Sequence, residues 1–213
     1  MGLERIFASA AMAACAFAWS APAAASTCDI IPENVEQSSS YSGFAESRMC
    51  EAGLPALWKG LPDNTASVMR FTFTSGHSMF FRTVTVTEFR SGKARIETVG
   101  GGFKRRDVRT PWNDISPIRR RLSTKKLTQI RALVEEAGVF KFKVGTWDKS
   151  DEDEGRIFMH CQLLEMERMD ASGYRFSSVN IGCNRPNRLM PLVDEIIARG
   201  RIAMVRDNWA GYR

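Results

Sequence analysis

Hydrophobic and polar residues alternate along several stretches in the first half of the chain. Met69, Phe71 and Phe73 alternate with Arg and Thr residues, which is the period of a strand with one buried face. Residues 79–89, rich in Phe, Val and Thr, and residues 94–99 each follow a short turn that contains Ser and Gly. The pattern therefore predicts a three-stranded antiparallel meander.

The second half of the chain contains two stretches in which apolar residues recur with the period of a helix that is buried on one side. Ser123 is the expected N-cap of the first helix, and Gly138 is expected to end it. Gly200 is expected to end the second helix. The apolar stripes are Leu127, Ile130, Leu133, Val134 and Ala137 in the first helix and Leu189, Leu192, Val193, Ile196 and Ile197 in the second.

A hairpin is predicted between the two helices. Residues 156–169 and 174–182 are both typical of strands. The residues between the strand ends, 171–173, form a three-residue loop whose last residue is a glycine, which suits a position with positive φ. This loop pairs Asp170 with Tyr174 and so sets the register of the hairpin.

The cysteines that follow the first 25 residues form an even set, which favours two disulfides in an oxidising compartment. Counting outward along the hairpin register places Cys161 opposite Cys183, at the separation that a cross-strand disulfide requires. Cys28 and Cys50 are then left to form the second disulfide. A zinc site is not supported, because the sequence has no C-x-x-C motif and only 2 His residues.

Together these elements predict an α+β domain. Its antiparallel sheet would consist of the three-stranded meander and the disulfide-linked hairpin, with two helices packed on one face. Residues 26–67 are polar and rich in turn-forming residues, so we expect an N-terminal appendage closed by the Cys28–Cys50 disulfide. Residues 68–213 would form the main domain.

The order of elements, together with Gly138, Phe140, residues 163–167 and residues 173–174, resembles the small uncharacterised secreted α+β proteins of proteobacteria. The resemblance covers roughly residues 120–200. It implies no activity, and no site residue is inferred from it.

The first 25 residues are typical of a signal peptide. A head that carries Arg5 precedes an uncharged apolar run, Ile6–Trp19, which is too short to span a bilayer. Small residues at 23–25 then provide the pattern that signal peptidase accepts, so we expect cleavage before Ser26. The mature protein would be periplasmic or secreted.

Two other N-terminal signals fit this sequence less well. A lipoprotein signal would place a lipid on Cys15, but the residues before this cysteine lack the usual Leu. A mitochondrial transit peptide would be rich in Arg and amphipathic, whereas this segment has an uninterrupted apolar middle. No later apolar run approaches the roughly 20 residues of a membrane helix, so none is expected in the mature chain.

Few residues suit catalysis. His77 and His160 are the only imidazoles that a nucleophilic or metal-dependent mechanism could use. Glu165 and Glu167 lie two apart on a predicted strand and so share a face, as an acid–base pair would, although a solvated strip of the hairpin is the simpler interpretation. Residues 148–155 form an acidic stretch without the spacing of a calcium loop. We expect neither a catalytic residue nor a cofactor nor a bound metal.

Residues 100–121 begin with three glycines and contain Pro111 and Pro117, so they predict an irregular connection with at most one short strand near Val108. Positive charge is concentrated around this connection. Between Arg70 and Arg131 there are 15 Lys and Arg but 4 Asp and Glu, in a chain whose net charge is +6.

This basic segment is the main functional indication in the sequence. Arginine forks and the exposed amides of a glycine turn are typical components of an anion site. We therefore expect an exported, non-catalytic module that binds an anionic envelope component or an acidic protein partner. The alternatives are a solvated basic flank, or a periplasmic hydrolase that uses a His or the carboxylate pair. The candidate anion-binding residues are Lys104, Arg105, Arg106, Arg109, Arg119, Arg120 and Arg121.

Overall fold

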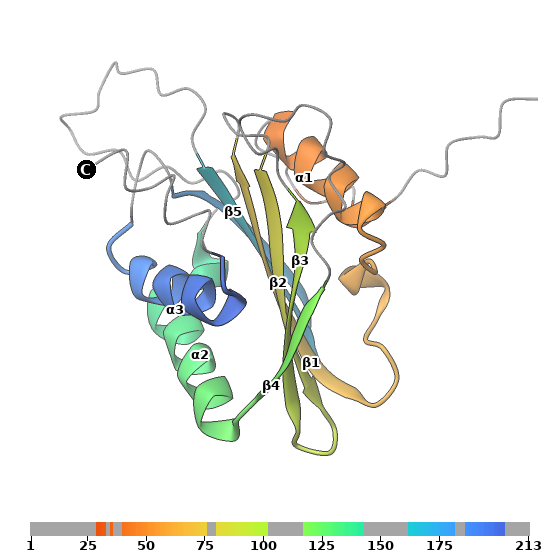
Figure 1. Ribbon diagram of the computed structural model, residues 1–213, viewed down its shortest axis with the longest axis vertical. Coiled ribbons are helices and arrows are strands. Elements are labelled where there is room, and N and C mark those ends of the chain that lie inside the picture. Colours follow the sequence, from red (N-terminus) through yellow and green to blue (C-terminus); the bar gives the residue numbers. More distant parts are fainter. Residues whose placement is uncertain are drawn as a thin grey trace, which may run out of the picture.

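The computed structural model describes residues 29–32, 35, 40–75, 80–101, 117–142, 162–181 and 186–202. A six-stranded antiparallel sheet, ordered β4-β3-β2-β1-β5-β6, forms the centre of the protein (Figure 1). The strands are β1 (Thr65–Ser75), β2 (Phe80–Phe89), β3 (Ala94–Gly101), β4 (Ile118–Leu122), β5 (Gln162–Asp170) and β6 (Gly173–Asn180). The helices are α1 (Ser40–Glu51), α2 (Thr124–Ala137) and α3 (Met190–Gly200), with short 3-10 turns η1 (Leu57–Lys59) and η2 (Val139–Lys141).

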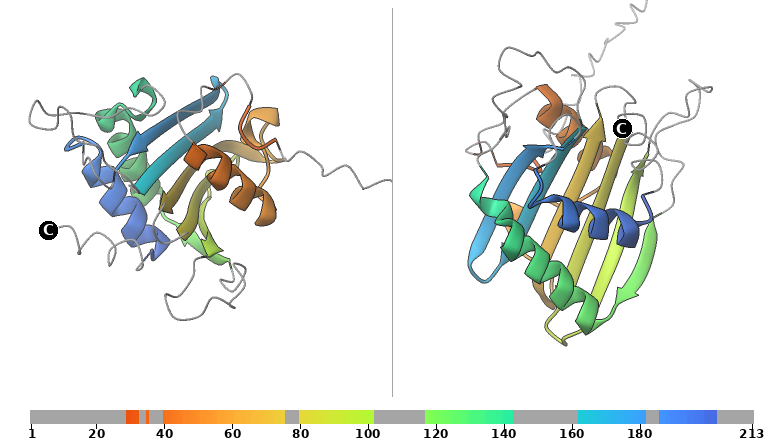
Figure 2. Two further views of the ribbon diagram at one scale, coloured as in Figure 1. Left: turned by 90° about the horizontal axis from the view of Figure 1, so that it is seen from above. Right: turned by 90° about the vertical axis from the view of Figure 1, so that its left-hand side faces the viewer.

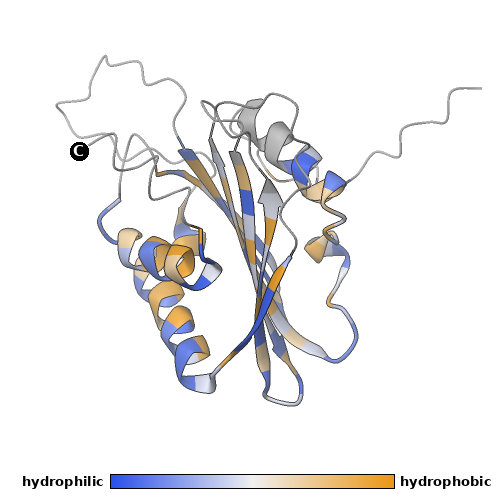
Figure 3. Cartoon of the chain, in the orientation of Figure 1, coloured by the Kyte–Doolittle hydropathy of each residue, from blue (hydrophilic) through white to orange (hydrophobic). Residues whose placement is uncertain are grey.

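The α+β architecture and the meander are confirmed, and the sheet is larger than the predicted meander alone. β1, β2 and β3 are consecutive antiparallel neighbours, and the β5–β6 hairpin joins the sheet because β5 pairs with β1. Hydrophobic and hydrophilic residues alternate along the strands (Figure 3). Every strand therefore presents one mainly apolar and one mainly polar side.

The main hydrophobic core lies between the apolar face of the sheet and helices α2 and α3 (Figure 2). Met69, Phe71 and Phe73 of β1 are buried there against the apolar stripes of both helices. Ser123 caps α2 by accepting a hydrogen bond from the Lys126 amide at 3.4 Å, and Gly138 takes the left-handed conformation, with φ of +59°, that ends the helix. The predicted bounds and caps of α2 are confirmed.

Helix α3 ends at Gly200, as predicted. The left-handed conformation that follows the helix belongs to Arg201, with φ of +55°. A Cβ atom at Gly200 would lie 2.6 Å from Cγ2 of Val84 on β2. The glycine is thus needed for the close approach of α3 to the sheet.

Helices cover both faces of the sheet, whereas the sequence predicted helices on one face only. Helix α1 lies on the side opposite α2 and α3 (Figure 2), where it packs over β1 and β2, and η1 packs over β5 and β6. The α1 sequence has few apolar residues and no regular stripe, which is why periodicity did not reveal it. A second, smaller apolar cluster lies beneath it, formed by Ile30, Ile31, Met49 and Phe81.

The hairpin register differs from the prediction by one residue. Asp170 pairs with Gly173, and Tyr174 pairs with Met169, so the loop has two residues instead of three. The Asp170 side chain closes this tighter turn by accepting a hydrogen bond from the Ser172 amide at 2.8 Å.

The predicted disulfide between Cys161 and Cys183 was derived from a three-residue loop. The observed register has a two-residue loop and no longer supports that derivation. Cys161 and Cys183 lie outside the described residues, as does Cys28. Cys50 is half-buried beside the second apolar cluster and is disulfide-bonded. Both predicted pairings remain predictions.

The connection that was expected to be irregular ends in a strand. Residues 118–122 form β4, which pairs with β3 and becomes one edge of the sheet. Val108, where a short strand had been expected, lies outside the described residues. Because successive residues of a strand point to opposite faces, β4 separates Arg120 from Arg119 and Arg121.

Gly200→Ala should destabilise the protein by about 1–3 kcal/mol, because the added methyl group overlaps a rigid β-branched side chain in a packed core. Urea denaturation of the variant measures this loss. Val84→Ala makes room for the methyl group, so the double variant should be less destabilised than the sum of the two single variants. Strictly additive losses would contradict the proposed contact.

Candidate functional site

The polar face of the sheet, on the side of α1, carries two groups of charged residues. One group lies beneath α1 and η1 and consists of the buried Arg70, Glu165 and Glu167 together with the half-buried Tyr174, which we call the buried polar cluster. The other group lies on the β3–β4 side and consists of Lys93, Arg95, Arg119 and Arg121, which we call the basic strip. The two groups belong to one face, because Glu167, Arg70, Thr85, Glu97 and Arg119 are successive cross-strand neighbours.

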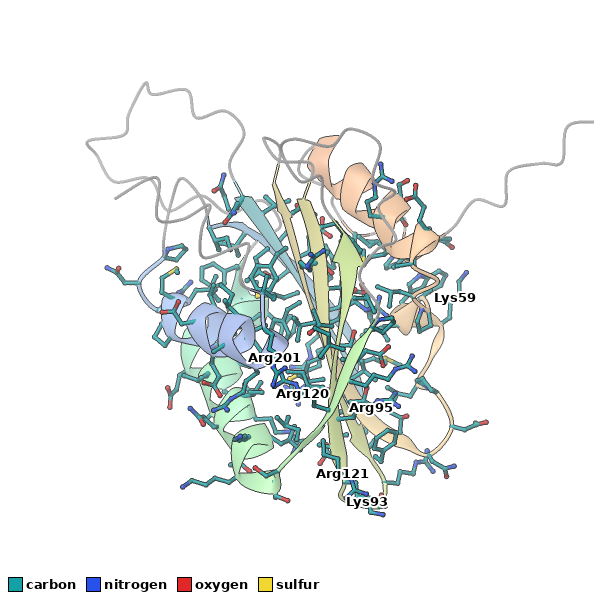
Figure 4. All side chains as sticks on the ribbon, in the orientation of Figure 1. Lys59, Lys93, Arg95, Arg120, Arg121 and Arg201 are labelled. Atoms are coloured by element: carbon teal, nitrogen blue, oxygen red, sulfur yellow. The ribbon has the colours of Figure 1, made fainter. Side chains whose placement is uncertain are left out.

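The basic strip brings like charges into direct opposition. Arg95 and Arg121 are cross-strand partners on the same face of β3 and β4. Such opposed like charges destabilise a sheet unless an anion is present. Lys93 immediately precedes β3, at the end of the sheet where Figure 4 also labels Arg121.

Glu97 is the one carboxylate on the described part of the strip. Its Oε2 lies 3.0 Å from Nε of Arg119 but 3.9 Å from Nε of Arg95. The hydrogen bond with Glu97 raises the pKa of Arg119. Glu97 is therefore used mainly by Arg119, and positive charge remains in excess at Arg95 and Arg121.

Arg120 has a different role from its two neighbours. It points to the face of α2 and α3, where its guanidinium donates a hydrogen bond to the carbonyl of Arg199 in the last turn of α3. Thr98 donates to the next carbonyl, that of Gly200, at 2.9 Å. Arg120 thus anchors the end of α3 to the sheet, and the structure does not bring it onto the basic strip (Figure 4).

Other candidate residues from the sequence lie outside the described residues. They are Lys104, Arg105, Arg106 and Arg109, on the segment that joins β3 to β4, both histidines, His77 and His160, and the acidic residues 148–155. In the described parts of the chain, no group of three or more His, Cys, Asp or Glu residues is placed to hold a metal ion.

The buried polar cluster is centred on an ion pair. Nη1 of Arg70 lies 3.1 Å from Oε2 of Glu167, and the two side chains are 1% and 2% exposed. The other guanidinium nitrogen, Nη2, donates to the Pro55 carbonyl at 2.6 Å, and the Tyr174 hydroxyl donates to Oε1 of Glu167 at 3.1 Å. The pair therefore connects β1, β5 and β6 to the segment between α1 and η1.

Glu165 lies beside this ion pair. It is 1% exposed, and neither carboxylate oxygen has a hydrogen-bond partner in the part of the chain that the structure describes. Burial, followed by the charges of Glu167 and Glu46, raises its pKa well above the ordinary value. Burial also raises the pKa of Glu167, although Arg70 and Tyr174 oppose that shift. Burial therefore disfavours the charged form of Glu165, which lacks the cation that Arg70 provides to Glu167.

The sequence correctly placed Glu165 and Glu167 on one face, but the expected solvated strip was wrong. Both are buried: η1 packs on β5 and β6, and α1, which was not predicted, packs on the neighbouring strands β1 and β2. One signal in the sequence pointed to the cluster. The neighbouring strand carries Arg70 among Thr residues, which is a cation that needs a carboxylate partner wherever the face is covered.

No family model and no curated protein matches this chain. The resemblance to small secreted proteobacterial proteins accordingly stays an expectation. None of the described helices is long and apolar enough to cross a membrane.

Arg70→Met should cost about 3–5 kcal/mol of stability, because it leaves the Glu167 carboxylate buried without a cation. The double variant Arg70→Met/Glu167→Met should be more stable than this single variant, since no unpaired charge remains. Urea denaturation measures both. Arg119→Met, which removes a pair on the exposed strip, is the matched control and should stay close to the wild type. An Arg70→Met variant as stable as this control would contradict the assignment.

Proposed function

We propose that this protein is an exported, non-catalytic module that binds an anionic, phosphate-bearing component of the cell envelope through the basic strip. The observation that carries the proposal is the direct opposition of Arg95 and Arg121. An unliganded sheet gains nothing from this arrangement, whereas a phosphate group between two guanidinium groups would accept hydrogen bonds from both.

The shape of the strip suits an extended charged surface. The strip lies on a sheet, beyond the part of the face that α1 and η1 cover. The Arg119 side chain is 63% exposed and that of Arg95 is 44% exposed. Anionic lipid headgroups provide phosphates across a plane, and each basic residue near such a surface contributes about 1 kcal/mol to binding. A lipid surface is therefore the ligand that we favour over an acidic protein.

The segment between β3 and β4 would add to this surface. Lys104, Arg105, Arg106 and Arg109 all belong to it, and the strands that it joins are the two that carry the strip. Export through the predicted signal peptide would bring the protein to the envelope, where anionic lipid is abundant. The periplasmic or secreted location is part of the same proposal.

A hydrolase with a carboxylate pair has less support. Glu165 and Glu167 have the proximity that an acid–base pair needs, and their pKa values differ in the degree to which they are raised. Both side chains are buried beneath the cover, however, so a substrate cannot reach them in this conformation. The open basic strip is the better candidate for a binding site.

Arg95→Gln/Arg121→Gln should weaken binding to phosphatidylglycerol vesicles about tenfold or more at low salt, because two of the four cations of the strip are lost. The same change should leave the protein as stable as the wild type or more so, since it removes a like-charge contact. Vesicle co-sedimentation and thermal denaturation measure the two effects.

Lys125→Gln/Lys141→Gln is the matched control, with the same change in net charge at two exposed residues of α2 and η2. These elements lie on the opposite face of the sheet, so this variant should bind nearly as well as the wild type. Equal losses in both variants would show that overall charge alone drives binding. Capture of an acidic polypeptide but not of anionic vesicles would overturn the choice of a lipid ligand.

A further inference from the structure

The Glu165 carboxyl group lies at the boundary between the sheet and the segment that covers it. Its cross-strand neighbours on β1 and β6 are Thr72 and Ser178. The Thr72 hydroxyl is already engaged with Thr83 at 3.1 Å and with the Met49 sulfur of α1 at 3.6 Å, while the buried Ser178 hydroxyl has no partner. The described surroundings therefore offer Glu165 no cation and no hydrogen bond that would stabilise its charged form.

Charged and titratable groups approach Glu165 from several elements. Glu167 lies on its own strand, Arg70 on β1, Tyr174 on β6 and Glu46 on α1. The cation of Arg70 is committed to Glu167 and to the Pro55 carbonyl. On β2 the nearest residue of this face is the uncharged Thr83, and Lys59 of η1 is half-exposed and paired with Asp29. Among the described residues, an ionised Glu165 would thus meet the carboxylates of Glu46 and Glu167, while Arg70, Lys59 and, on α1, Arg48 are already paired.

Helix α1 is held on the sheet by an apolar cluster smaller than the main core, by Glu46 and by the disulfide-bonded Cys50. Oε1 of Glu46 accepts hydrogen bonds from the amides of Ile30 and Ile31, both at 3.0 Å. Met49 adds one side chain to the small apolar cluster around Phe81. Helix α1 contributes no strand to the sheet, so it can leave without breaking a ladder of hydrogen bonds. Regions with few buried apolar contacts are those that open locally at low free-energy cost.

We propose that Glu165 is a proton-binding site that controls the docking of α1 on the sheet. With a proton on its carboxyl group, Glu165 is neutral and α1 covers it. Loss of the proton creates a buried charge between Glu46 and Glu167, and displacement of α1 lets water reach that charge.

This switch acts when the pH rises. The carboxyl group has its ordinary pKa when α1 is open and a raised pKa when α1 is docked. The docked form therefore has its full stability below the ordinary pKa of glutamate, about 4.3. It loses that stability progressively as the pH rises toward the raised pKa of Glu165. Opening would also expose Arg70 and Glu167, which share a cross-strand row with Glu97 and Arg119 of the basic strip. If the strip binds an anion as proposed, the switch would change the extent of that surface.

Hydrogen–deuterium exchange of the mature protein without lipid tests the switch. Between about pH 5 and about pH 9, a range that includes the raised values known for buried glutamates, protection of the α1 amides should fall. After correction for intrinsic exchange, the fall should be about tenfold per pH unit until it levels off above the raised pKa, because one proton is linked to opening. Amides of β1 should keep their protection throughout.

Glu165→Gln removes the titrating group, so protection of α1 should become independent of pH. Glu136→Gln, at an exposed position of α2, is the matched control and should behave like the wild type. Glu46→Gln keeps an oxygen for the Ile30 and Ile31 amides but removes one repelling charge, so its opening should move to higher pH. This variant keeps the test decisive if Glu165→Gln does not fold.

Three outcomes would overturn the proposal. They are constant protection of α1 in the wild type, the same pH dependence in Glu165→Gln as in the wild type, and an unchanged midpoint in Glu46→Gln. None of them depends on lipid binding, so failure of the switch is distinguishable from failure of the basic strip as a binding site.

Discussion

The ion pair between Arg70 and Glu167 is the interaction on which the arrangement of this protein depends. It lies in the middle of the sheet, is almost completely buried and makes further hydrogen bonds to the Pro55 carbonyl and the Tyr174 hydroxyl. A buried ion pair contributes little net stability, but it is costly to break. The pair therefore specifies where the segment between α1 and η1 must lie, because only that position supplies the carbonyl that completes it.

The two faces of the sheet have correspondingly different roles. One face is a conventional hydrophobic core, in which α2 and α3 bury the aromatic and aliphatic residues of all the central strands. The other face carries charged residues on both sides of the small apolar cluster, and these charges have two kinds of surroundings. Those near β5 and β1 are covered and paired, whereas those on β3 and β4 are open to solvent and carry excess positive charge. Binding is proposed for the open part and pH sensing for the covered part.

Local patterns along the sequence predicted the apolar face well. The stripe from Leu127 to Ala137, the Ser123 cap and the Gly138 terminus all follow from side-chain period and capping chemistry, and these are properties of neighbouring residues. The prediction failed where contacts between distant residues decide the outcome. The approach of Gly200 to Val84 on another strand was not predicted, and the described contacts of α1 come from one carboxylate, a small cluster and a disulfide-bonded cysteine instead of an apolar stripe.

The same contrast between local patterns and distant contacts applies to the candidate sites. Charge alone marked Arg119 and Arg121 as candidate anion-binding residues. That Arg120 points to the opposite face follows only once residues 118–122 are known to form a strand. The pairing of Glu167 with Arg70 joins residues that are far apart in the sequence, and no local pattern reveals it. The shift of the β5–β6 register shows how a single side-chain contact, from Asp170 to the Ser172 amide, alters a prediction based on loop length.

The central claim is that the polar face beneath α1 is held with Glu165 uncharged. Titration of the side-chain carboxyl carbon of Glu165 by nuclear magnetic resonance, with the signal assigned by its loss in Glu165→Gln, tests this claim most directly. The account predicts that Glu165 remains protonated through the range, about 4.3, in which exposed glutamates titrate, because burial and the neighbouring carboxylates raise its pKa. Titration of Glu165 together with the exposed glutamates would contradict the account.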